Sequence, residues 1–458
     1  MVLTANWLLL PHRQYWKWFM LAASYVFYGA WDWRFLGLIG LCTLINQAAA
    51  VLMARSTDDR SRRTVVVAAV ALNLGILGWF KYYGFFVSSL INLLEPVGID
   101  LPLPLLQITL PVGISFFTFQ ALSYTIDVYR RRQDQVPLLD FAVFLAFFPQ
   151  LVAGPIVRSS EFLPQLYTPK DPRHIDATRA FGLIAGGLFK KVVVANTLAG
   201  AIVDPVFASP SQFSALEVLV GIYGYAVQIY ADFSGYTDIA IGVAILMGFE
   251  FPQNFNAPYA ALSIQDFWRR WHMTLSRWLR DYLYIPLGGS RDGRGNTYRN
   301  LMITMILGGL WHGAAWTFVL WGAFHGGLLA FERWRGETSP VPAQTLATPA
   351  GRAASRIITF HLVCLGWVMF RADSMSRVGE ILGRFLDWGP APAVTPMVVA
   401  LIAGSIGVQY IDLDIRARLQ TAFSHLRPVA MTAVLGAFLL ILDGLGPEGV
   451  APFIYFQF

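Results

Sequence analysis

Residues 301 to 331 read LMITMILGGLWHGAAWTFVLWGAFHGGLLAF, the longest stretch of the chain without a formal charge. About 20 apolar residues suffice to cross the hydrocarbon layer of a bilayer, so a run of this length is typical of a membrane protein. Further apolar stretches recur along the chain, at residues 35–54, 64–80, 108–126, 396–411 and 429–442. The pattern predicts a chain that crosses a membrane many times.

The overall composition supports the same interpretation. Of 458 residues, 56% are hydrophobic and only 14% are charged, whereas soluble domains carry roughly 25% charged residues. We expect an all-α, polytopic helical membrane protein with roughly ten to twelve transmembrane helices, together with re-entrant and interfacial helices. Residues 1–458 are predicted to form one membrane domain, in which 1–15 is a truncated first span and 336–354 is an exposed loop.

The net charge of +6 indicates membrane topology and not nucleic-acid binding, because short cytoplasmic loops retain Lys and Arg. One basic cluster lies at residues 55–63 and a second at residues 130–132. One outward and one return crossing separate them, so both are predicted on the same, cytoplasmic side. Cys42 and Cys364 form neither a metal-binding spacing nor a redox pair, and we expect no metal site.

Two carboxylates, Asp232 and Asp238, lie inside an otherwise apolar helical stretch. Ionisable groups at such depth usually face the interior of a helix bundle or a water-filled cavity. They can contact a substrate or simply hydrogen-bond neighbouring helices. The sequence leaves both interpretations open and slightly favours the structural one.

A basic and aromatic segment follows at residues 263–282. Ser263 precedes an acidic residue by three positions, which indicates a helix start. The spacing predicts one interfacial helix with an apolar arc and a basic arc. The basic arc contains Arg269, Arg270, Arg277 and Arg280. His272 falls at the edge of the apolar arc, where a packing role and a functional role carry equal weight.

The uncharged run contains two histidines, His312 and His325. A polar ring is unfavourable in hydrocarbon, so an imidazole inside a span is a functional-site hypothesis by default. Glycines flank His312, and they let other groups approach its backbone. We therefore favour a functional role for His312 and a helix-to-helix hydrogen bond for His325.

At these residues the chain resembles the membrane-bound O-acyltransferase family, and within it the bacterial alginate O-acetyltransferase (AlgI-like) branch. The matching segments occur in order along almost the whole chain. They include LPVGISFFTFQ at 110–120, FFPQLVAGPI at 147–156, DFSGYTD at 232–238, NFNAPY at 254–259, LWHG at 310–313 and FIYFQF at 453–458.

The resemblance implies a ring of helices around a funnel that reaches the catalytic histidine from both membrane faces. It identifies His312 as the catalytic histidine and His272 as a second active-site histidine. Substrate contacts are expected from Asp232, Asp238, Arg269, Arg270 and Trp311. The implied donor is acetyl-CoA or another cytoplasmic acyl thioester, with no bound cofactor. Implied partners are membrane lipid, an exported polysaccharide acceptor and a periplasmic SGNH-type protein, at the bacterial inner membrane.

Three alternatives remain open at this stage. A transporter or flippase could use the buried Asp and His residues as a path, although no inverted repeat is present in the sequence. A passive scaffold for polysaccharide export would not need His312. Within the acyltransferases, D-alanyl transfer to a cell-envelope polymer is the alternative reaction. A serine hydrolase is disfavoured because no Gly-x-Ser-x-Gly motif occurs.

Overall fold

The computed structural model describes residues 1–99, 103–104, 106, 108–338, 348–411, 421–422 and 428–445. Within these residues the chain is all-helical and contains no β-strand. Five helical segments are long and apolar enough to cross a membrane, namely Arg13–Arg55, Asp59–Val97, Ala177–Ala208, Ala215–Leu246 and Pro349–Arg371. The predicted class, a helical membrane protein, is confirmed. The number of membrane spans, roughly ten to twelve, stays a prediction.

The chain divides into two compact units. The first comprises Met1–Ala177 and Val243–Pro252, and the second comprises Thr178–Gly242 and the described part of Gln253–Phe458. The helices of the first unit are α1 Val2–Leu9, α2 Arg13–Asp32, η1 Trp33–Phe35, α3 Leu36–Arg55, α4 Asp59–Leu77, η2 Gly78–Tyr82, α5 Tyr83–Leu94, η3 Glu95–Val97, α6 Ile114–Tyr129, α7 Leu138–Ala146, α8 Phe148–Leu151, α9 Ser159–Tyr167 and η4 Pro172–His174.

The second unit contains most of α13 and all the helices that follow it. Its elements are α10 Ala177–Leu188, η5 Phe189–Ala195, α11 Asn196–Leu198, η6 Ala199–Val203, α12 Asp204–Ala208, η7 Pro210–Gln212, α13 Ala215–Leu246, η8 Pro258–Ala260, α14 Ile264–Trp268, α15 Met273–Leu279, η9 Arg280–Tyr284, α16 Gly293–His312, α17 Trp316–Thr338, α19 Pro349–Arg371, α20 Met375–Gly383, η10 Arg384–Leu386, α21 Pro396–Gly407, η11 Val408–Tyr410 and α23 Pro428–Leu445.

In the first unit, α3, α4 and α6 pack against one another around a buried polar network. Asn46 and Asn73 exchange side-chain hydrogen bonds at 3.0 and 3.2 Å. Thr125 donates to the same Asn46 oxygen at 2.6 Å. The asparagines also donate to carbonyls one turn earlier in their own helices, at 2.8 Å each. Each amide therefore both donates and accepts, as buried polar groups require.

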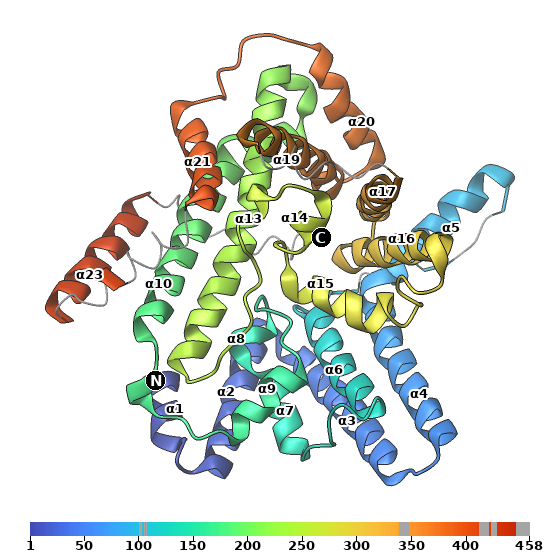
Figure 1. Cartoon of the computed structure of the whole chain (residues 1–458), viewed down its shortest axis with the longest axis vertical. Coiled ribbons are helices and arrows are strands. Elements are labelled where there is room, and N and C mark those ends of the chain that lie inside the picture. The colour runs from blue at the N-terminus through green and yellow to red at the C-terminus, as the bar shows by residue number, and fades with distance from the viewer. Residues whose placement is uncertain are drawn as a thin grey trace. The chain divides into compact units, whose positions relative to one another are not determined.

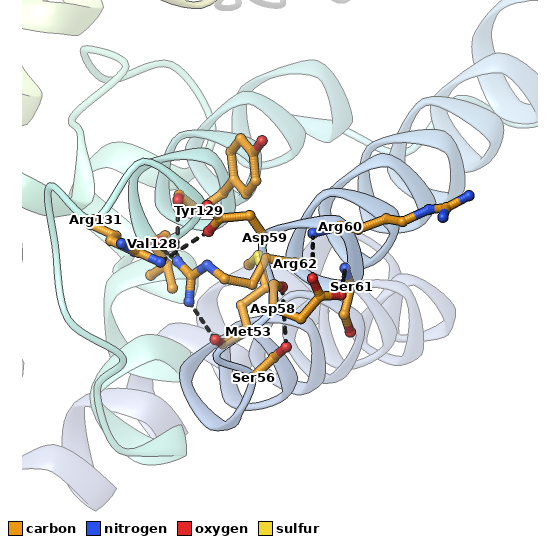
Figure 2. Close-up of polar contacts among 10 residues, drawn as sticks. All are labelled: Met53, Ser56, Asp58, Asp59, Arg60, Ser61, Arg62, Val128, Tyr129 and Arg131. Atoms are coloured by element: carbon orange, nitrogen blue, oxygen red, sulfur yellow. Dashed lines mark hydrogen bonds and ion pairs between the residues drawn. The ribbon is translucent and has the colours of Figure 1, made fainter.

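The two basic clusters meet at one end of these helices (Figure 2). Arg62 of α4 donates to the main-chain carbonyls of Val128 and Tyr129 at the end of α6, at 2.9 and 3.1 Å. Arg131, just after α6, pairs with Asp59 at 3.0 Å. The clusters lie together, as the sequence predicts, whereas the side of the membrane that they face stays a prediction.

The uncharged run from 301 to 331 forms two helices, α16 and α17, and is not one continuous span (Figure 1). The two helices pack against each other as a hairpin. A Cβ atom at Gly309 would collide with the main-chain oxygen of Phe318, and one at Gly322 with that of Met305. These glycines therefore allow α16 and α17 to approach backbone to backbone.

The exposed loop predicted at 336–354 is shorter than expected. Helix α17 extends to Thr338, and α19 begins at Pro349, where the Thr348 hydroxyl accepts a hydrogen bond from the Gly351 N–H at 3.0 Å. Thr348 therefore acts as a helix cap, and Pro349 occupies the first helical turn, where its missing N–H costs nothing. Residues 339–347 lie outside the described part of the chain.

Candidate active site

His312 is the last residue of α16 and is 3% exposed. Aromatic rings from three helices surround its imidazole. Trp311 of α16 and Trp321 of α17 lie 5.1 Å away between ring centroids, and Phe370 of α19 lies 5.2 Å away. Helix α16 ends here because Gly313 adopts an extended conformation before α17 begins. The hairpin thus places an imidazole at a helix terminus within an aromatic enclosure.

The prediction of a single interfacial helix for residues 263–282 is wrong. Two short helices, α14 and α15, flank a break at His272, whose φ of 42° and ψ of 53° are left-handed. This conformation is uncommon for a residue other than glycine, and such strain concentrates at functional sites. The predicted helix start is confirmed, since the Ser263 side chain accepts from the Asp266 N–H at 3.0 Å.

His272 is fully buried and not at a wet boundary. Its Nδ1 lies 3.1 Å from the side-chain oxygen of Asn254. That oxygen also accepts hydrogen bonds from the Thr274 main-chain N–H at 3.2 Å and hydroxyl at 2.9 Å. Because a main-chain N–H can only donate, the shared atom must be the amide oxygen. His272 Nδ1 therefore carries a proton, and Nε2 of the neutral ring is the proton acceptor.

The structure brings His272 and His312 together, with ring centroids 6.3 Å apart. The ring of Trp311 contacts both, at 5.9 Å from His272 and 5.1 Å from His312. The chain reverses between them at Gly288 and Gly289, which have positive φ values of 111° and 62°. Glycine adopts such conformations without steric cost, so the paired glycines permit the reversal. The catalytic roles of the two histidines stay a prediction.

The two carboxylates of α13 form ion pairs with neighbouring lysines of η5. Asp232 lies 2.7 Å from the Lys191 ammonium, and both side chains are almost fully buried. Asp238 lies 2.5 Å from the Lys190 ammonium, which also donates to Ser234 at 2.9 Å. The lysines lie in a π-helical segment, a distortion frequent at functional sites. These pairs match the structural interpretation, and substrate contact remains untested.

The predicted basic arc does not exist as one helical face. Arg269 and Arg270 lie in the break after α14, whereas Arg277 is in α15 and Arg280 begins η9. Arg270 pairs with Asp266 at 2.8 Å. Arg269 is exposed and forms no ion pair within the described residues. Arg270 is therefore paired already, whereas the exposed Arg269 has no acidic partner among the described residues.

Comparison with known sequences agrees with this geometry. The sequence profile of the membrane-bound O-acyltransferase family matches residues 61–362. The chain belongs to the membrane-bound O-acyltransferase family. It is 37% identical to a protein named probable alginate O-acetylase of Pseudomonas putida, over 98% of this chain and 96% of that protein. A protein of the same name in Pseudomonas aeruginosa is 40% identical, over 86% and 75%. A peptidoglycan O-acetyltransferase of Helicobacter pylori is 36% identical, over 80% and 73%.

This membrane-bound O-acyltransferase contains one site residue that sequence reasoning missed. Asn254 receives three hydrogen bonds from the His272–Thr274 segment and so fixes the orientation of the His272 ring. The sequence offers only a weak signal, namely an amide directly before an aromatic residue at the start of the 254–259 motif. Among the described residues, no group of three His, Cys, Asp or Glu side chains could hold a metal ion. The expected absence of a metal site stays a prediction.

His325 of the O-acyltransferase lies close to the pair but in a different setting. It contacts Trp268 and Trp321 at 5.4 and 4.9 Å between ring centroids. Neither ring nitrogen forms a hydrogen bond within the described part of the chain. A Cβ atom at Gly366 would lie 2.7 Å from its Nε2. Close packing therefore holds the ring, and the expected hydrogen bond from His325 to another helix is not formed within the described residues.

Proposed function

We propose that this O-acyltransferase moves an acetyl group from a cytoplasmic acyl thioester, such as acetyl-CoA, to hydroxyl groups of an exported polysaccharide. The observation that carries the proposal is the buried pair of imidazoles, 6.3 Å apart, at the end of a glycine-rich helical hairpin. The names of the relatives from the two Pseudomonas species favour alginate as the acceptor.

His312 is proposed as the general base. Its imidazole removes the proton from an acceptor hydroxyl as the hydroxyl oxygen attacks the thioester carbonyl carbon. The carbon–sulfur bond then breaks, and the imidazolium returns its proton to the leaving thiolate, which departs as a free thiol. A histidine suits both steps because its ordinary pKa lies near neutrality. No cofactor enters the scheme.

His272 is proposed to hold the acceptor through a second hydroxyl, next to the hydroxyl whose proton His312 removes. Its Nδ1 proton is engaged by Asn254, so Nε2 of a neutral ring can accept a hydrogen bond but cannot donate one. Polarising the thioester carbonyl would require a donor at that nitrogen. This geometry therefore favours binding of the hydroxyl over activation of the carbonyl. Trp311, which contacts both imidazoles, is proposed as the wall against which the acyl group lies.

The remaining expectations are part of the same proposal. The chain spans the bacterial inner membrane several times, around a funnel that brings donor and acceptor to the histidines from opposite faces. Arg269 is exposed and is proposed to meet phosphates of the donor or of lipid headgroups. Arg270, already paired with Asp266, contributes less. A periplasmic SGNH-type protein is the proposed partner that receives or delivers the acetyl group.

A direct test uses membrane vesicles that contain the whole chain, acetyl-CoA labelled in its acetyl group and a mannuronate oligosaccharide, with the periplasmic partner added. Free thiol and labelled oligosaccharide are both measured. His312→Ala is expected to lower acetyl transfer by about 100-fold or more at unchanged protein abundance. The matched control is His174→Ala, since the His174 side chain is 82% exposed. A variant that keeps over about a tenth of wild-type transfer would remove His312 as the base.

The same assay separates the enzyme from a transporter. A transporter or flippase releases no thiol from acetyl-CoA, whether or not the oligosaccharide is present. An acetyltransferase releases thiol and labels the acceptor in equal amounts. Equal labelling of mannuronate and peptidoglycan fragments would still support the acyltransferase activity. It would contradict alginate as the preferred acceptor.

A further inference from the structure

The first unit contains a cavity of about 320 Å³ that is separate from the histidine site. It lies among the α1–α2 turn, the end of α9 and the segment that follows α9, and Phe249 contributes one wall. Its volume is at the lower end of the range for small-molecule sites. Three of its lining residues are cations and none is a carboxylate.

The neutral polar side chains of the cavity are already occupied by protein partners. The indole N–H groups of Trp7 and Trp16 donate to oxygen acceptors at 3.0 and 2.8 Å. The Thr168 hydroxyl donates to a main-chain carbonyl at 3.1 Å. Gln165 uses both ends of its amide, donating at 2.8 and 2.9 Å and accepting at 2.8 Å. The three cations are therefore the lining residues that can still donate hydrogen bonds to a ligand.

Two of the three cations lack a matching negative charge. Lys17 pairs with buried Asp140 at 2.5 Å and is neutralised. Lys170 donates to a main-chain carbonyl and lies 4.1 Å from the centroid of the Phe249 ring. Neither neighbour carries a formal charge. The side chain of Arg13, an exposed residue, forms no hydrogen bond or ion pair with any residue that the structure describes.

Burial lowers the pKa of Lys170 to about 8, and the more distant Glu250 opposes this only in part. A charged ammonium is thus held where water is scarce and no full counter-charge is provided. An anion bound beside Lys170 would restore the balance. Arg13 would add up to five N–H donors, and Lys170 the two that its carbonyl contact leaves over.

We propose that this cavity binds a phosphate group between Arg13 and Lys170. Phosphate oxygens offer the several acceptors that a guanidinium and an ammonium together require. The apolar walls, formed by Leu10, Trp16 and Phe249, suit an attached hydrocarbon or glycerol portion. The phosphate can come from a phospholipid headgroup or from a soluble phosphate compound.

The test measures binding of phosphatidylglycerol to the purified whole chain by native mass spectrometry, with phosphatidylcholine as the neutral comparison. Arg13→Gln and Lys170→Gln are each expected to weaken phosphatidylglycerol binding about fivefold, and the double variant more than tenfold, as expected from the attraction of an anionic lipid for each cation. Lys170→Arg keeps the cation and is expected to retain binding. Arg173→Gln is the matched control, because Arg173 is nearby, exposed and paired with Asp171 at 2.8 Å.

A second arm identifies the source of the phosphate. Inorganic phosphate is added to the delipidated protein, and the thermal midpoint is measured for the wild type and the double variant. Stabilisation by inorganic phosphate only in the wild type assigns the cavity to a soluble phosphate, and selective binding of phosphatidylglycerol without it assigns a lipid. Equal binding by wild type and a folded double variant would overturn the proposal, as would an equal loss in Arg173→Gln.

Discussion

The polar network between α3, α4 and α6 and the histidine cluster between α14 and α19 are both fully buried, yet they treat polar groups differently. In the first, Asn46, Asn73 and Thr125 bond to one another and to their own helices. In the second, aromatic rings surround the imidazoles of His272 and His312, which lie 6.3 Å apart between ring centroids. Closed networks of the first kind rigidify a core, whereas buried polar capacity of the second kind marks a functional region.

The strongest test of this contrast is His272→Ala. The substitution removes the proposed partner of the second acceptor hydroxyl, so acetyl transfer is expected to fall about 100-fold. Thermal stability is expected to change far less than activity. His272→Gln keeps bulk and polarity, and near-normal turnover in this variant would show that His272 only anchors its segment. Transfer rates at saturating donor, with thermal midpoints as the control, decide between the two.

Asn254 gives the next largest effect, because it acts through His272. Asn254→Ala leaves three donors without their shared acceptor, and we expect turnover to fall about tenfold with a stability loss of about 2 kcal/mol. Asn254→Asp keeps an oxygen in the same place and is expected to recover stability. Its negative charge also favours a protonated His272.

The pH–rate profile distinguishes these roles. If Asn254 positions His272, the Asn254→Asp variant shifts the profile, whereas Asn254→Ala lowers the rate without such a shift. A purely structural Asn254 would give normal turnover per folded molecule in both variants.

In the polar network of α3, α4 and α6, a substitution is expected to lower stability more than activity. Asn46→Leu removes the donor to the buried Asn73 side-chain oxygen and one acceptor each for the Asn73 amide nitrogen and the Thr125 hydroxyl. We expect a loss of about 2–3 kcal/mol in stability and unchanged acetyl transfer per folded molecule. The measurement is the thermal midpoint in detergent together with specific activity. A fall in specific activity at normal stability would contradict the division between the two regions.

The sequence indicates the helical class, the helix start at Ser263 and the meeting of the basic clusters, because each depends on local composition or on simple topology. The sequence also identifies His272 and His312 as candidate site residues. It does not reveal the break at His272, since helical periodicity continues through residues 263–282 and the left-handed φ is imposed by contacts with Asn254. Tertiary contacts here override local propensity.

The hairpin of α16 and α17 was hidden for a different reason. Lack of charge measures compatibility with hydrocarbon but not continuity of a helix, and the turn at Gly313 separates two helices within one uncharged run. The glycines that flank His312 were recognised as sites of close approach. The close neighbour of Gly309 and Gly313, Phe318, becomes apparent only when the second helix is in place.

The smallest expected effect concerns the ion pair that joins the two basic clusters. Arg131 and Asp59 are 66% and 86% exposed at the side chain, and an exposed pair of this kind contributes at most about 0.5 kcal/mol. Arg131→Gln should therefore leave both the thermal midpoint and acetyl transfer almost unchanged. Arg62, only 6% exposed, instead donates to the carbonyls that end α6. Arg62→Gln should lower stability by about 2 kcal/mol or more because those carbonyls lose charged donors. Equal effects of the two substitutions would mean that the charges, and not the buried hydrogen bonds, hold α4 against α6.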